Sequence, residues 1–157
     1  MSHLLRINGQ RLVDSLFELG KYGALEGGGV CRLAAPPEDK AGRDVVVARM
    51  EALGLDIRID AIGNVTGIYA GEQDLPMVMM GSHIDTVGTG GLYDGNYGVM
   101  AGLEVIATLQ DAGIRPLRPL AVTFFTNEEG VRFQPDMMGS VVFAGEYPLE
   151  AALGAKD

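Results

Sequence analysis

Cysteine and histidine are scarce in this chain of 157 residues, which has one cysteine, Cys31, and two histidines. A single cysteine excludes an internal disulfide bond and every zinc motif that is built from several cysteines. A lone cysteine is more often a small buried apolar group than a nucleophile, and nothing around Cys31 marks an activated thiolate. We therefore assign Cys31 no chemical role.

Basic stripes and long apolar runs are absent as well. The formal net charge is −9 and Lys and Arg form no cluster, which argues against nucleic acid as a partner. The acidity does not exclude an anionic substrate, because a bound cation can reverse the local field. No apolar run reaches the length of a bilayer, and residues 1–10 lack the basic start and apolar stretch of a signal peptide. We expect a cytoplasmic protein without a membrane partner.

Apolar periodicity predicts a layered α/β domain. Helices are expected at residues 8–20, at 39–53 and from the glycine-rich loop at 88–95 to about residue 113. Strands are expected at residues 55–59, 65–70, 77–80 and 120–125. The run at 77–80 is apolar throughout and rich in methionine, which is typical of a strand that is covered on both faces, with its methionines packed in the core. Strands that alternate with helices favour one α/β domain without a linker.

A histidine and an aspartate follow the expected strand at 77–80, in the segment Gly-Ser-His-Ile-Asp-Thr at residues 81–86. In open α/β sheets, ligands bind beyond the carboxyl ends of strands. His83 can bind a metal ion there, and Asp85 can reach the other ring nitrogen and fix the tautomer. The alternative is a histidine that is simply hydrogen-bonded at a strand end, and the triplet alone leaves both interpretations open.

Three more carboxylates stand at the ends of expected elements. Asp94 lies at the start of the third expected helix, where it could equally be an ordinary N-cap. Glu128 and Glu129 follow directly on the strand at 120–125, where they could equally form a solvated acidic loop. Adjacent buried carboxylates are costly unless a cation or a proton compensates them. Together with His83 they offer hard oxygen ligands and one imidazole, which suit zinc, manganese or a similar divalent ion.

A nucleotide-binding module is a weaker alternative for the glycine-rich loop at residues 88–91. The loop precedes a helix, but it lacks the complete glycine fingerprint of such modules. Asp94 would also place a negative charge where a phosphate is expected.

Two long segments carry a resemblance to a known family. They are GSHIDTVGTGGLYDGNYGVMAGLEVI at 81–106 and TNEEGVRFQPDMMGSVVFAG at 126–145. Both resemble the carbamoylase and allantoate amidohydrolase branch of the zinc-peptidase-like M20 family, as do GGGVCRL at 27–33 and DAIGNVTGIYAG at 60–71. The similarity extends from about residue 8 to about residue 147. It implies a zinc-peptidase-like catalytic domain, with a mixed sheet flanked by helices.

The resemblance also implies a role for each candidate residue. His83 would bind one metal ion, Asp94 would bridge two ions, and Glu129 would bind the second. Glu128 would be the general base that activates water and then protonates the leaving nitrogen, and Asp85 would orient His83. The implied cofactors are two divalent ions per complete site, zinc or manganese, with cobalt or nickel as further options.

The implied reaction is hydrolysis of the C–N bond of an N-carbamoyl amino acid or of a ureido acid such as allantoate. Aminoacylases and dipeptidases of the same family are the alternative. The segment LYDGNYGV at 92–99, close behind His83, favours the amidase branch. Gly88 stands where related sequences often have proline, which affects only the shape of the loop.

The length of the chain departs from the family pattern. Family members continue well beyond this point, with a smaller lid domain for dimerisation and two further histidine ligands. The second histidine of this chain, His3, matches no family motif. The resemblance therefore implies that residues 1–157 correspond to the N-terminal part of the catalytic domain, without the lid and the C-terminal catalytic part. Such a truncated chain is expected to be inactive alone, and the full-length parent is expected to form a homodimer.

Overall fold

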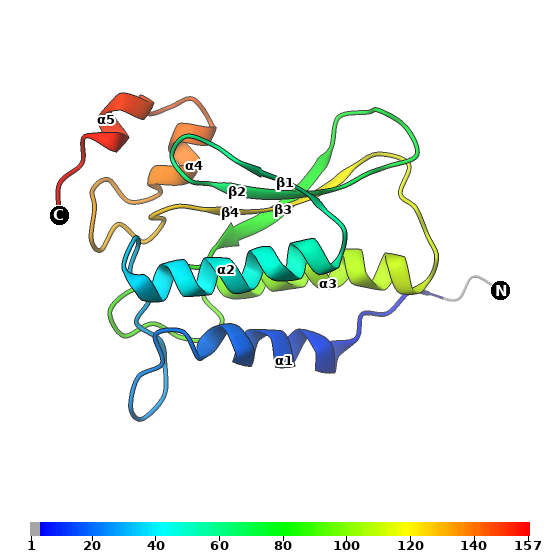
Figure 1. Ribbon diagram of the computed structural model, residues 1–157, viewed down its shortest axis with the longest axis horizontal. Coiled ribbons are helices and arrows are strands. Elements are labelled where there is room, and N and C mark those ends of the chain that lie inside the picture. The colour runs from blue at the N-terminus through cyan, green and yellow to red at the C-terminus, as the bar shows by residue number, and fades with distance from the viewer. Residues whose placement is uncertain (1–3) are drawn as a thin grey trace.

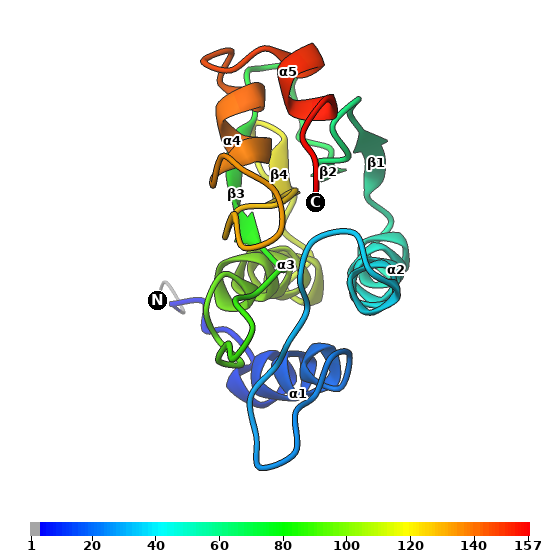
Figure 2. The ribbon, with the colours of Figure 1, turned by 90° about the vertical axis from the view of Figure 1, so that its left-hand side faces the viewer.

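A mixed four-stranded sheet forms an outer layer of the computed structural model, which describes residues 4–157 (Figure 1). Helices α2 and α3 lie against one face of the sheet, and α1 lies beneath them as a third layer (Figure 2). The short helices α4 and α5 lie beyond one end of the sheet (Figure 1). The bounds of the elements are α1 Gly9–Gly20, α2 Pro37–Ala52, β1 Asp56–Ile59, β2 Val65–Tyr69, β3 Val78–His83, α3 Asn96–Asp111, β4 Leu120–Phe125, α4 Met138–Phe143 and α5 Leu149–Leu153.

The order of the strands is β1-β2-β4-β3. Strand β2 runs antiparallel to both β1 and β4, whereas β3 runs parallel to β4. His83, the last residue of β3, pairs with Phe125, the last residue of β4. Both strands therefore end at the same edge of the sheet, and the segments that follow them start side by side.

Helix α1 shows how the sequence pattern becomes packing. The side chain of Asn8 accepts a hydrogen bond from the backbone N–H of Arg11 at 3.1 Å and so caps the first turn. Leu12, Leu16 and Leu19 share one face and are buried in the main core. The predicted helix and its buried stripe are confirmed.

Strand β3 corrects one sequence-based expectation. It is an edge strand, and Val78 and Met79 are 44% and 36% exposed, as is Met77 just before it, at 41%. Helix α3 packs against one face of β3, while the described residues leave much of the other face open. The prediction of a strand covered on both faces, with all its methionines in the core, was therefore wrong, and only Met80 packs against the core.

Several smaller expectations have plain outcomes. Helix α2 begins at Pro37, two residues earlier than predicted, because proline suits the first turn of a helix. Cys31 is a free, half-buried thiol. His3 lies outside the described residues. Across residues 4–157, no helix combines the length and the apolar character needed to cross a bilayer.

Candidate metal centre

His83, Asp94 and Glu129 come together at the sheet edge where β3 and β4 end. Each offers one possible ligand atom, and these three atoms all lie within 4.8 Å of one another. His83 comes from the end of β3, Glu129 from the loop after β4, and Asp94 from the loop before α3. The predicted convergence is confirmed, while the metal-binding roles remain predictions.

His83 is held by two backbone features. Its Nδ1 lies 2.9 Å from the carbonyl oxygen of Asp85, which fixes the ring if Nδ1 carries the proton and leaves Nε2 free for a metal ion. The ring also lies directly over Gly95, because a Cβ at that position would be 2.4–2.5 Å from three ring atoms. Gly95 has a φ of 64°, which glycine adopts without strain. Glycine at 95 therefore makes room for the imidazole.

Asp85 contributes differently from the sequence-based expectation. Its carboxylate was expected to reach the ring of His83, yet Oδ1 is 3.8 Å from Nδ1 and the Asp85 carbonyl makes the contact instead. The carboxylate turns towards the other loop, where Oδ2 accepts a hydrogen bond of 3.1 Å from the N–H of Glu129. Asp85 thus orients His83 through its carbonyl oxygen and Glu129 through its carboxylate.

The loop after β4 turns at Asn127, which is buried and has a φ of 53°. Its side-chain amide donates to the carbonyl oxygen of Phe133 at 2.8 Å and so ties the loop to the segment that follows. The carboxylate of Glu128 accepts a hydrogen bond from the hydroxyl of Ser140, whose Oγ lies 2.8 Å from Oε1 and 3.0 Å from Oε2. Ser140 stands in α4, twelve residues further on; the family-like segment at 126–145 contains it, but sequence reasoning assigned it no role. It holds the predicted base in place.

Negative charge accumulates at this edge of the sheet. Burial raises the pKa of Glu129, and the carboxylates of Asp94, Asp85 and Glu128 raise it further, while His83 acts in the opposite direction. Burial also raises the pKa of Asp85, against hydrogen bonds from the N–H groups of Glu129 and Glu128. The Oδ1 atom of Asp85 is buried, and no described residue hydrogen-bonds to it. A divalent cation fits this set of donors, because it would compensate the buried negative charge and the repulsion that Asp94, Asp85 and Glu128 exert on Glu129.

Sequence reasoning missed three buried polar residues next to the centre, Arg32, Thr86 and Asn96. All three connect the loops that carry the candidate ligands. Only the resemblance at residues 27–33 touched Arg32, and without assigning it a role. A lone arginine between two apolar residues gives no sequence signal of burial, so the fold was needed to find it.

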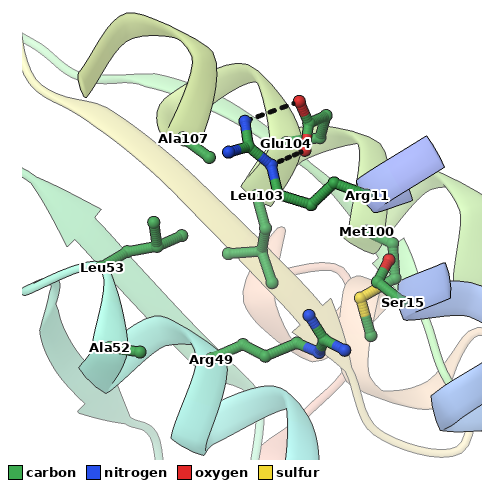
Figure 3. A pocket seen from close by; sticks show the side chains of 9 residues that line it. All are labelled: Arg11, Ser15, Arg49, Ala52, Leu53, Met100, Leu103, Glu104 and Ala107. Atoms are coloured by element: carbon green, nitrogen blue, oxygen red, sulfur yellow. Dashed lines mark hydrogen bonds and ion pairs between the residues drawn. The ribbon is translucent and has the colours of Figure 1, made fainter. Parts of the chain in front are cut away.

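A separate hollow of about 150 Å³ lies between α1, α2 and α3 (Figure 3). Arg11 and Glu104 form a two-pronged ion pair in its lining, with Nε 2.7 Å from Oε2 and Nη2 2.9 Å from Oε1. Leu103 forms part of its apolar wall. None of the candidate metal ligands lines this hollow, so it is distinct from the centre.

Comparison with known sequences finds the model of "Peptidase family M28" matching residues 64–153. The chain is 42% identical over 146 residues to an N-carbamoyl-L-amino acid amidohydrolase of Geobacillus stearothermophilus, covering 92% of this chain and 36% of that protein. It is 36% identical to the allantoate amidohydrolase of Bacillus subtilis, covering 93% of this chain and 36% of that protein. The chain thus spans about a third of the length of these curated relatives.

Comparison with solved structures gives the same picture. The chain superimposes on an amidase of the hydantoinase/carbamoylase family from Burkholderia vietnamiensis with a TM-score of 0.97. The two are 48% identical, and the match covers 100% of this chain and 38% of that one. The fold predicted from the sequence, a mixed sheet flanked by helices, is confirmed.

Proposed function

The chain belongs to peptidase family M28 and, within the M28/M20-like amidohydrolases, to the hydantoinase/carbamoylase branch, and on this premise we propose that it supplies part of the catalytic machinery of a metal-dependent amidohydrolase. The proposed substrates of the whole enzyme are N-carbamoyl amino acids and related ureido acids such as allantoate. The observation that carries the proposal is the convergence of His83, Asp94 and Glu129 within 4.8 Å. The substrate class is taken from the names of the relatives of this chain.

His83, Asp94 and Glu129 would hold the divalent ions. The chemistry that bound divalent ions supply is polarisation of the scissile carbonyl and a lower pKa for the attacking water. Zinc and manganese both accept this mixture of imidazole and carboxylate ligands. The raised pKa of Glu129 supports this assignment, because burial and the neighbouring carboxylates oppose its ionised form and a bound cation would favour it.

Glu128 would move the proton. Its carboxylate would take a proton from the attacking water and give it to the nitrogen that leaves the substrate carbonyl. The hydrogen bond from Ser140 fixes the position of that carboxylate. With an N-carbamoyl amino acid, the products would be the free amino acid, carbon dioxide and ammonia.

We further propose that residues 1–157 correspond to the N-terminal part of the catalytic domain of such an enzyme. The supporting observation is that the matches cover 92–100% of this chain but only 36–38% of the relatives. The remaining histidine ligands and the lid that forms a homodimer would then belong to the parts of the relatives that this chain does not match.

A chimera tests the proposal. This chain would replace the matching segment of the Geobacillus stearothermophilus relative, with which it shares 42% identity. We expect the chimera to release ammonia from an N-carbamoyl-L-amino acid in the presence of manganese or zinc, and the chain alone to release none. A folded, metal-loaded chimera without activity on any ureido substrate would contradict the proposal.

Hydrolysis of a dipeptide or of an N-acyl amino acid is the second candidate, because the matching family model describes peptidases. The same chimera separates the two candidates when it is given an N-carbamoyl amino acid, allantoate, an N-acetyl amino acid and a dipeptide. Preference for the dipeptide or the acetyl compound would favour the second candidate.

A further inference from the structure

Arg32 is a completely buried cation with an exposed fraction of 0%. Within residues 4–157, its side chain forms no direct contact with a carboxylate. Four of its five side-chain N–H groups have acceptors at 2.7–3.0 Å, which are three backbone carbonyls and one side-chain amide oxygen. Burial lowers its pKa to about 10, against the more distant charges of Asp39 and Asp85, so it stays protonated at neutral pH. Such a group is costly to bury, and its acceptors show what it connects.

Two of the acceptors anchor the guanidinium to α1. Nη1 donates to the carbonyl oxygen of Leu19 at 3.0 Å and to that of Tyr22 at 2.7 Å, at the C-terminal end of the helix. Carbonyl groups at a helix C-terminus lack partners within the helix and carry partial negative charge, so they suit a cation. Arg32 is therefore fixed on one side by a rigid element of the core.

The other two acceptors lie in the segments that carry His83 and Asp94. Nε donates to the carbonyl oxygen of Ile84, the residue between His83 and Asp85, at 2.8 Å. Nη2 donates to Oδ1 of Asn96 at 2.8 Å, two residues after Asp94.

The backbone of Arg32 strengthens the first link. Its N–H donates to the hydroxyl of Thr86 at 2.8 Å, and its carbonyl oxygen accepts from the N–H of Thr86 at 2.8 Å.

Asn96 passes the second link on to the turn that carries Asp94. Its side-chain amide donates to the carbonyl oxygen of Leu92 at 3.2 Å, and its backbone N–H donates to that of Asp94 at 2.6 Å. The Asp94 turn and the His83 strand end therefore share one buried donor group. No other described side chain donates hydrogen bonds to both segments, so the guanidinium is their shared polar link, beside the packing of the His83 ring over Gly95.

We propose that Arg32 is a positioning residue of the metal centre, which holds the His83 strand end and the Asp94 turn at the separation that lets both side chains bind the same ion. This inference rests on the proposed function for the identity of the centre. It assigns no contact between Arg32 and a substrate or a metal ion. Residues that support metal ligands from behind change metal affinity by about 10- to 100-fold when they are replaced.

The test uses the protein itself and three variants. Arg32→Met removes every link, Arg32→Lys keeps the charge but not the fork of donors, and Asn96→Ala removes only the link to the Asp94 turn. Leu12→Ala is the matched control, because it opens a cavity in the same core, on α1, away from both loops. Zinc affinity is measured by calorimetry. Hydrogen exchange of the metal-free protein is followed at the amides of Thr86, Gly90 and Asn96, all of which have backbone acceptors.

We expect Arg32→Met to weaken zinc binding by about 10- to 100-fold and to speed exchange at all three amides relative to those of β4. Arg32→Lys should lie between this variant and the wild type, and Asn96→Ala should loosen only the turn at 92–96. Leu12→Ala should lower stability but change neither the relative exchange nor the zinc affinity.

Two outcomes would overturn the proposal. One is an Arg32→Met protein, or an Arg32→Lys protein if the first does not fold, whose loops and zinc affinity match those of Leu12→Ala. The other is an Asn96→Ala protein whose turn at 92–96 exchanges as in the wild type. If the wild-type chain binds no zinc, its three candidate ligands do not hold an ion by themselves. The exchange data then decide alone whether Arg32 holds the loops, while the chimera tests the proposed function separately.

Discussion

Gly95 provides the sharpest prediction, because the imidazole of His83 occupies the space that any side chain would need. An alanine Cβ would lie 2.4 Å from Cε1 and 2.5 Å from both ring nitrogens. Carbon atoms in good contact are about 3.5 Å apart, so the ring would have to move by about 1 Å. We therefore expect Gly95→Ala to displace His83 from the candidate metal centre.

The cost of this substitution has two parts. Gly95 has a φ of 64° and a ψ of −52°, and a residue with a Cβ in such a sparsely populated backbone conformation costs about 1–3 kcal/mol. Forcing an extra methyl group into a packed site costs about 1–3 kcal/mol more. The free energy of unfolding should fall by about 2–6 kcal/mol, and zinc affinity should fall by at least about 10-fold.

Gly91→Ala is the matched control in the same loop. A Cβ at Gly91 meets no atom within 4 Å, and its φ is not positive. Both variants would be studied by urea denaturation and by ¹⁵N NMR of the histidine rings, of which the chain has only two. A Gly95→Ala protein that is as stable as Gly91→Ala, with an unshifted His83 signal, would refute the placement of the ring over Gly95.

Three further predictions concern the carboxylates Glu104, Glu129 and Glu128. Burial would raise the pKa of Glu104, but hydrogen bonds from Arg11, Asn8 and Thr108 outweigh it and keep the pKa below its usual value. In urea denaturation, Glu104→Gln should therefore cost about 2–3 kcal/mol at neutral pH, a loss that shrinks as the pH falls below about 4.3. Glu129 has a raised pKa, so its ionised form opposes folding at neutral pH. In thermal melts without metal, Glu129→Gln should therefore be more stable than the wild type by less than about 1 kcal/mol. Zinc should no longer raise the Tm of this variant. In the chimera, Glu128→Gln should lower ammonia release by at least about 100-fold and leave the zinc content unchanged, whereas loss of zinc would make Glu128 a ligand.

Local signals in the sequence predicted much of the fold. Asn8 and the leucines of α1 have the cap and the spacing of an amphipathic helix, and the run at 120–125 is a buried strand as expected. The error at β3 arose because an apolar run does not tell a central strand from an edge strand. Strand order is decided by pairing between strands that are far apart in the chain. Val78 lies at the edge of the sheet because β3 pairs with β4 only, where the partner of Val78 is Leu120.

The candidate site was predicted in its residue types but not in its supports. His83, Asp94 and Glu129 stood at the ends of expected elements, and the shared edge of two parallel strands brings them together. The contact of His83 with the Asp85 carbonyl depends on backbone geometry that side-chain patterns do not encode. The same holds for Arg32, whose acceptors are mostly backbone oxygens far away in the sequence.

A zinc titration followed by ¹⁵N NMR of the histidine rings tests the metal centre most directly. We predict that zinc shifts the Nε2 signal of His83, that Nδ1 keeps its proton, and that Asp94→Asn weakens this response by at least about 10-fold. His3, which matches no motif, serves as the internal comparison. A His83 ring that stays unchanged while zinc binds elsewhere, or a response that Asp94→Asn leaves intact, would contradict a metal centre at the shared edge of β3 and β4.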